Sequence, residues 1–146
     1  MLVREILESR PRSVVTTDIQ TTIITALQLL INNKISCLPV VSKTGELQGI
    51  VSERDILRLV YDKPADFKNC TVGQIMSTDV ITACPEDDVD HIASLMTRHR
   101  FRHVPILEGP TIVGLISIGD IVKVRLANAE DENRHLHKFI DGNYPA

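Results

Sequence analysis

The sequence predicts an α/β (α+β) fold in which two pseudo-symmetric βαββα units pack as one module, followed by a C-terminal helix. Two observations support this: the chain repeats its own landmarks in order, and each copy alternates β-branched runs with segments of helical periodicity. With 146 residues, of which 43% are hydrophobic and 24% charged, the chain can form two small units sharing a core.

The internal repeat aligns residues about 66 positions apart. Val14–Thr16 lies over Val80–Thr82 at an offset of 66, and Gly49–Ser52 lies over Gly114–Ser117 at an offset of 65. A unit of roughly 60 residues buries only about 60% of its unfolded surface and would be marginally stable alone. We therefore expect the copies to meet across a pseudo-twofold axis, with two related clefts where they join.

Each copy predicts the same series of elements. In the first copy these are a strand at Val14–Thr17, a helix at Ile23–Ile31, strands at Leu38–Val41 and Leu47–Val51 joined by the turn Lys43–Gly45, and a helix opened by Ser52. The second copy starts its first helix at Pro85–Asp88 and turns at Glu108–Pro110. The predicted domains are repeat 1 (1–61), a polar linker (62–71), repeat 2 (72–127) and a helical tail (128–146).

The tail predicts a separate amphipathic helix. Its cap lies at Asn128–Asn133, its apolar residues are Leu136, Phe139 and Ile140, and it ends at Gly142. We expect this helix to pack on the domain or on a second subunit.

Composition excludes several classes of protein. The chain has no apolar run near the ~20 residues of a membrane span and does not begin as a secretory signal. A formal net charge of −3 and 3% aromatic residues argue against a nucleic-acid binder. Three scattered cysteines encode no disulfide framework or zinc site, which indicates a reducing cytoplasm. No catalytic or metal-binding motif is present, so the sequence predicts neither an enzyme nor a metal site.

A Gly-apolar-apolar-Ser-x-x-Asp run crosses from strand to helix in each copy, ending at Asp55 and Asp120. One interpretation is a capping box, in which Ser and Asp satisfy the first amides of the helix. The other is ligand binding, in which the carboxylate accepts from two vicinal ribose hydroxyls and the helix start faces a phosphate. Its recurrence in both copies favours a function.

Positive charge is concentrated between Arg98 and His103. Cations near a helix C-terminus complement the helix dipole, which explains Arg98. Arg102 and His103 enter the next strand, where they could reach a cleft and neutralise phosphate. The first copy has Ser36 and Cys37 at the matching positions, so we expect its cleft to suit a less anionic group.

These landmarks, from Ile35–Val41 and Gly45–Asp55 to Phe101–Pro105 and Gly114–Asp120, resemble tandem CBS (cystathionine beta-synthase) domains. The resemblance covers nearly all of residues 3–126. It implies one Bateman module that binds adenosine-containing ligands such as AMP, ADP, ATP, NAD or S-adenosylmethionine in composite clefts. The family's homodimers and its regulatory role in sensing energy state are implied with it.

The resemblance also assigns residues. Cleft 1 would combine Ile50, Ser52 and Asp55 with Thr82, Arg102 and His103, and cleft 2 would combine Leu115, Ser117 and Asp120 with Thr16, Ser36 and Cys37. The Asp would hold the ribose, Thr and nearby backbone the adenine edge, and Arg102 or His103 the phosphates. This chain departs from the family at Ile19, where proline is usual and where Pro85 keeps it; the departure predicts a looser Thr16 segment.

The sequence therefore predicts a non-catalytic sensor with no required cofactor, whose adenine nucleotide ligand is regulatory and whose regulated partner is another chain. One alternative is a ligand-free module for dimerisation or protein interaction. A second alternative, with less support, is a nucleic-acid binder that uses Arg98–Arg102.

Overall fold

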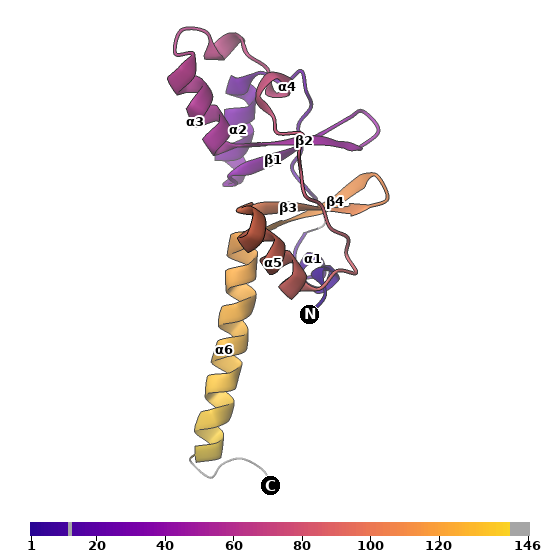
Figure 1. Ribbon diagram of the computed structural model, residues 1–146, viewed down its shortest axis with the longest axis vertical. Helices are drawn as coiled ribbons and strands as arrows, with labels where there is room; N and C mark the ends of the chain where they lie inside the picture. The colour runs from indigo at the N-terminus through magenta and orange to yellow at the C-terminus, as the bar shows by residue number, and fades with distance from the viewer. Residues whose placement is uncertain (12, 141–146) are drawn as a thin grey trace.

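The computed structural model describes residues 1–11 and 13–140, with side chains up to residue 136. Two similar halves stack on each other, and a long C-terminal helix projects from the lower half (Figure 1). Each half contains a two-stranded antiparallel sheet covered by helices. This mixed architecture confirms the predicted fold class.

The elements follow the duplicated order. Repeat 1 contains α2 (Ile23–Asn33), β1 (Cys37–Val41), β2 (Leu47–Ser52) and α3 (Glu53–Asp62). Repeat 2 contains α5 (Val89–His99), β3 (His103–Glu108), β4 (Thr111–Ser117) and α6 (Ile118–Ile140). Short helices precede each repeat: α1 (Val3–Glu8) before the first, and the 3-10 helix η1 (Phe67–Asn69) and α4 (Val72–Ile75) before the second.

The turns and helix ends match between the copies because their local chemistry matches. Gly45 and Gly109 adopt φ values of +85° and +60° in the two hairpin turns, a conformation that glycine reaches without a Cβ clash. Lys34 and Arg100 both end their helices in the left-handed conformation, with φ of 54° and 60°.

The predicted first strand of each copy is reduced to a single parallel bridge. Thr17 bridges Val40, and Ala83 bridges Ile106. In the first copy, Thr17 N donates to the Pro39 carbonyl over 3.0 Å and Val41 N donates to the Thr17 carbonyl over 2.8 Å. The β-branched run Val14–Thr17 therefore joins the sheet at one residue only, and the prediction of a full strand there is wrong.

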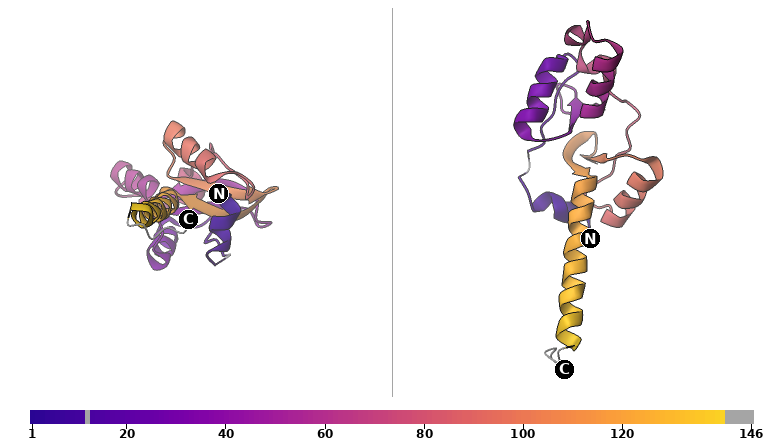
Figure 2. Two further views of the ribbon diagram at one scale, coloured as in Figure 1. Left: turned by 90° about the horizontal axis from the view of Figure 1, so that it is seen from below. Right: turned by 90° about the vertical axis from the view of Figure 1, so that its left-hand side faces the viewer.

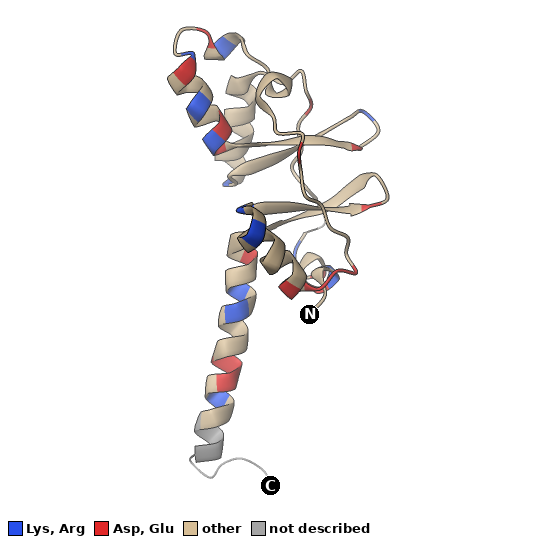
Figure 3. Cartoon of the chain, in the orientation of Figure 1, with Lys and Arg blue, Asp and Glu red and all other residues tan. Residues whose placement is uncertain are grey.

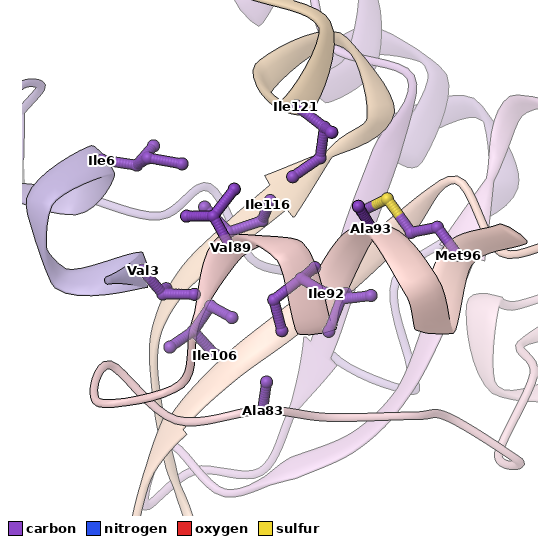
Figure 4. Close-up of a cluster of buried hydrophobic side chains, with 11 residues drawn as sticks. Val3, Ile6, Ala83, Val89, Ile92, Ala93, Met96, Ile106, Ile116 and Ile121 are labelled. Atoms are coloured by element: carbon purple, nitrogen blue, oxygen red, sulfur yellow. The ribbon is translucent and has the colours of Figure 1, made fainter. Parts of the chain in front are cut away.

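The two halves exchange their leading helices. Val3 and Ile6 of α1 are buried in the core of repeat 2, among residues of α5, β3 and β4 (Figure 4). In the same way, Val72 of α4 is buried in the core of repeat 1 with Ile23 and Leu38. Figure 2 shows α1 beside the lower half, far from the rest of repeat 1. This exchange joins the two repeats, as the marginal size of one unit requires.

The departure at Ile19 does not change how the copies are held. The carbonyl of Ile19 accepts from Gly73 N over 2.9 Å, and the carbonyl of Pro85 accepts from Arg4 N over 2.9 Å. Both carbonyls therefore anchor an exchanged helix by the same bond. A backbone carbonyl is present in every residue, so isoleucine serves here as well as proline.

The C-terminal tail differs from its prediction. α6 runs without a break from Ile118 to Ile140, so no new helix is capped at Asn128. Its second half projects away from both repeats instead of packing on them (Figure 1). This part carries the acidic residues Glu130–Glu132 followed by Arg134 (Figure 3), and Leu136 is 58% exposed. The predicted end at Gly142 lies outside the described residues, as do the side chains of Phe139 and Ile140.

Within the described part of the chain, none of the helices is both long and apolar enough to cross a membrane.

Candidate functional site

Both Ser-x-x-Asp runs form capping boxes of nearly equal geometry. Ser52 N donates to Asp55 Oδ2 over 2.8 Å, Ser52 Oγ lies 3.0 Å from the same oxygen, and Asp55 N donates to Ser52 Oγ over 3.3 Å. The matching distances for Ser117 and Asp120 are 2.8, 3.1 and 3.2 Å. The capping interpretation is thus confirmed in both copies. One oxygen of each carboxylate, Oδ1, takes no part in the cap.

The starts of β1 and β3 meet where the repeats join. Glu53 N donates to the Ser36 carbonyl and Ile118 N to the Arg102 carbonyl, each over 2.9 Å. Ser36 Oγ and His103 Nε2 then lie 3.1 Å apart, which links the two copies by a hydrogen bond between side chains. We call this contact region, at Ser36 and His103, the seam.

Two residues predicted for the clefts, Cys37 and His103, have pKa values that burial and nearby charges shift. Burial raises the pKa of Cys37 to about 12, and the charge of Asp55 adds to this effect. Burial lowers the pKa of His103, while the charge of Asp120 acts in the opposite direction. The charge of Glu53, from repeat 1, also raises the pKa of His103, and the charge of Arg102 lowers it, so groups of both repeats act on this imidazole.

A pocket of about 510 Å³ opens beside the seam on the side of repeat 2. It lies between α1 with the segment after it, the start of β1, and β4, and it includes Arg10, Val14, Val15, Cys37, Gly114 and Leu115 in its wall. Cys37 and Leu115 are residues predicted for cleft 2, and Thr16 directly follows Val15 in the chain. The structure therefore brings part of the predicted cleft 2 to a real cavity. Pockets of this size commonly bind small molecules.

Arg10 both lines this pocket and contacts Asp120. Its guanidinium Nη1 lies 3.4 Å from both Oδ1 and Oδ2 of Asp120, and its Nη2 donates to the Leu115 carbonyl over 3.3 Å. Arg10 lines the pocket, whereas Ser117 and Asp120 are not part of its wall. Sequence reasoning missed Arg10 because it lies 110 positions from Asp120 and belongs to no repeated motif.

The charges of the pocket differ from the expectation for cleft 2. We expected a cleft for a less anionic group, but two arginines, Arg4 and Arg10, line it together with Glu8 and Glu108. Each arginine already has an acidic partner, because Arg4 pairs with Glu86 and Arg10 pairs with Asp120.

In the other predicted cleft, the strand residue Ile50 is bridged by the backbone of Ser77. Ile50 N donates to the Ser77 carbonyl over 2.9 Å, and Ser77 N donates to the Ile50 carbonyl over 2.8 Å. The backbone of Ile50, a residue predicted for cleft 1, is therefore already paired. Ser52 and Asp55 lie together at the start of α3, while Thr82 and Arg102 are exposed.

The described residues contain no group of three or more His, Cys, Asp or Glu side chains placed to hold a metal ion.

Comparison with known proteins identifies the repeats. The family model for the CBS domain matches residues 3–62 and again residues 72–127. The crystal structure of the CBS-domain containing protein ATU1752 from Agrobacterium tumefaciens is 34% identical, has a TM-score of 0.81, and overlaps 86% of this chain and 99% of that one.

Further relatives include one whose structure contains bound ligands and several that are longer than this chain. A CBS domain pair of protein MJ0100, solved in complex with 5′-methylthioadenosine and S-adenosyl-L-methionine, is 29% identical with a TM-score of 0.78; the match covers 88% of this chain and 98% of that one. The mitochondrial CBS domain-containing protein CBSX3 of Arabidopsis thaliana is 34% identical over 84% of this chain. The chain spans 62% of that relative's length, and only 42% and 23% of two relatives from Methanocaldococcus jannaschii.

Proposed function

Because this chain belongs to the CBS-domain family, with one CBS domain in each repeat, we propose that it is a non-catalytic regulatory module that binds an adenosine-containing small molecule. The observation that carries the proposal is the pocket of about 510 Å³ beside the seam, with Asp120 one side chain away from it. Its volume suits a nucleoside or nucleotide. The related CBS domain pair of MJ0100, whose structure holds 5′-methylthioadenosine and S-adenosyl-L-methionine, supports this class of ligand.

The proposed roles follow the chemistry of the wall. The carboxylate of Asp120 accepts from the two ribose hydroxyls, because its Oδ1 is not used by the helix cap. Leu115 and the segment through Thr16 meet the adenine edge with their backbone groups. Cys37 is a wall residue, since its raised pKa keeps it a neutral thiol.

Cleft 1 is the second proposed site. In this cleft Asp55, capped with Ser52, would hold the ribose, and Arg102 and His103 would bind the phosphate. A ligand that reaches the backbone of Ile50 must first break its two bonds with Ser77. Cleft 2 is therefore proposed to fill first.

The module acts on another chain by a shift of conformation. A ligand that contacts both repeats favours the arrangement in which the cleft is closed around it, by no more than its difference in affinity for the two states. The exposed apolar residues of α3 and of the first half of α6 provide a face for a homodimer, through which such a shift reaches a partner. These residues are Leu57, Tyr61, Ile118, Val122 and Leu126.

The competing function is a structural module without a ligand. It is favoured by the two completed capping boxes and by Arg10, which already occupies Asp120. A role in nucleic-acid binding has less support, since Arg98 and Arg100 lie at the end of α5, where they complement the helix dipole.

Thermal unfolding with added ligand tests the proposal. AMP, ADP, ATP, NAD, S-adenosylmethionine and 5′-methylthioadenosine are each titrated while the melting temperature is followed. A bound ligand at about 100 times its Kd adds about 2.7 kcal/mol of stability. Asp120→Asn should abolish the first binding event and Asp55→Asn the second. No shift with any of the six compounds would favour the structural module.

A further inference from the structure

We propose that Arg10 sets the ligand class of cleft 2: it admits adenosine compounds that carry an anionic group and disfavours the uncharged nucleoside. This inference rests on the proposed function and adds to it the chemistry of the ligand. Arg10 contacts Asp120, the carboxylate that is proposed to hold the ribose. Whether Arg10 stays on Asp120 or moves away therefore decides which ligand can bind there.

The bond between Arg10 and Asp120 is loose enough to exchange. The guanidinium nitrogens lie 3.4 Å from the carboxylate oxygens, whereas a strong charge-assisted pair measures about 2.7–2.9 Å. The side chain of Arg10 is 35% exposed and that of Asp120 is 19% exposed, so water reaches the cation more readily than the anion. A competing acceptor in the pocket can therefore draw Arg10 away without a change of backbone.

The other copy shows what the same position looks like without an arginine. Asp55 has the same cap as Asp120, but no side-chain cation contacts it in the described residues. The carbonyl of Ile50 is held by the backbone of Ser77 over 2.8 Å, where the carbonyl of Leu115 is held by the Arg10 side chain over 3.3 Å. A side chain can rotate away from its acceptor more easily than a backbone segment can move. Cleft 2 can therefore open by a rotamer change.

The charge of the ligand then decides the free energy of opening. Arginine stays protonated at any ordinary pH, so a released Arg10 needs a new acceptor. An uncharged nucleoside takes Asp120 and leaves the half-buried guanidinium with water alone. A phosphate or carboxylate offers two oxygens in the geometry that a guanidinium prefers. Selectivity follows from this difference between the two ligands.

The other charges of the pocket do not supply the same effect. Arg4, on the exchanged helix α1, is paired with Glu86 and does not contact Asp120. Glu8 and Glu108 are acidic and repel an anion. Among the described residues of the wall, Arg10 is thus the cation that an incoming anion would meet as it displaces the pair with Asp120.

The experiment compares AMP with adenosine, which differ by the phosphate group alone. The variant Asp55→Asn leaves Asp120 as the only ribose-binding carboxylate, and binding is measured by calorimetry in this background. We expect AMP to bind at least about tenfold more tightly than adenosine. Adding Arg10→Ala should reduce that ratio to about threefold or less, with tighter adenosine binding and weaker AMP binding.

Two control variants make the result specific. Arg10→Lys keeps the charge but loses the planar fork, so it should give an intermediate ratio. Arg4→Ala removes the other arginine of the wall, which does not contact Asp120, and should lower the ratio less than Arg10→Ala does. Circular dichroism of each variant checks that the fold is retained.

The outcomes separate this inference from the proposed function. If the ratio of AMP to adenosine affinity is the same with and without Arg10, the inference is overturned while the binding itself stands. If wild-type protein binds AMP but Asp55→Asn does not, cleft 2 is no ligand site and the inference is overturned as well. If no variant binds either compound, the inference and the proposed function both fail.

Discussion

Ser36 Oγ and His103 Nε2 lie 3.1 Å apart, and this hydrogen bond joins the residue before β1 in one repeat to the first residue of β3 in the other. The two residues come from positions 67 apart in the chain. Because burial lowers the pKa of His103, the neutral imidazole is the form that the folded protein prefers. The seam is therefore sensitive to protonation.

The first prediction concerns pH. The pKa of His103 in the folded protein lies below its ordinary value of 6.5, so the unfolded chain takes up the proton first as pH falls. The stability that His103 contributes is thus present above pH 6.5 and is lost as pH falls through its folded pKa. The melting temperature of His103→Gln should fall less between pH 7.5 and 5 than that of the wild type.

A second histidine variant controls for general acid effects. His91 is exposed near the start of α5 and belongs to neither side of the Ser36–His103 contact. His91→Gln should therefore lose as much melting temperature on acidification as the wild type does. Equal pH profiles for His103→Gln and the wild type would contradict the role given to the seam.

The second prediction concerns the two capping boxes. Asp55→Ala and Asp120→Ala each remove the acceptor for the N-cap amide and hydroxyl, and each should lower the free energy of unfolding by about 1 kcal/mol. Asp120 also loses its exchangeable pair with Arg10, which adds about 0–1 kcal/mol. Urea unfolding measures both values. A carboxylate that served ligand binding alone would show no loss in the absence of ligand.

The third prediction compares two glycines at matching positions. A Cβ on Gly49 would lie 2.7 Å from the backbone oxygen of Ser77, whereas a Cβ on Gly114 would meet the methyl end of the Leu7 side chain. A backbone oxygen cannot move aside as easily as the end of a leucine side chain, which can adopt another rotamer. Gly49→Ala should therefore cost about 1–3 kcal/mol of stability and Gly114→Ala less.

Urea unfolding of the two alanine variants, side by side, gives the comparison. A larger loss for Gly114→Ala than for Gly49→Ala would show that the segment at Ser77 gives way more easily than α1. The backbone pairing of Ile50 with Ser77 would then not be what limits access to cleft 1.

The fourth prediction concerns thiol chemistry. With a pKa of about 12, Cys37 holds roughly one thiolate in ten thousand at pH 8, and its side chain is buried. Cys84 is exposed. Iodoacetamide should therefore modify Cys84 in the folded protein and Cys37 only after unfolding, as peptide mass spectrometry can measure. Rapid modification of Cys37 would show that the wall of cleft 2 opens to solvent.

The fifth prediction concerns the dimer face. Tyr61 is 85% exposed on α3 and Val122 is 50% exposed on α6. A glutamate at either position would place a charge in an apolar contact, so Tyr61→Glu and Val122→Glu should convert a dimer to a monomer in light scattering. Ile31→Glu, at a residue 71% exposed on α2, is the matched control and should stay dimeric. A monomeric wild type would remove the proposed face.

Local chemistry explains why much of the fold could be predicted. The caps at Ser52 and Asp88, the turns at Gly45 and Gly109, and the helical spacing from Ile23 all depend on neighbours within a few residues. Such signals are present in the sequence itself. The prediction of a strand at Val14–Thr17 was wrong because β-branched residues indicate an extended backbone. They do not indicate how many backbone hydrogen bonds a neighbouring strand will form with it.

The candidate site divides in the same way. The two acidic residues could be found by their repetition, since duplication placed Asp55 and Asp120 in the same local motif. The sequence did not predict the exchange of α1 and α4 between the two cores, nor the contact of Arg10 with Asp120.

The amino-acid sequence by itself determined the duplication, the elements of each copy and the carboxylates at the two helix starts. Only the tertiary structure decided which of the two predicted clefts lies at the open pocket and which side chain pairs with the carboxylate of that cleft. The physical reason is distance along the chain: Arg10 reaches Asp120 because α1 packs in the core of the other repeat, and contacts across 110 positions leave no periodic or local signal.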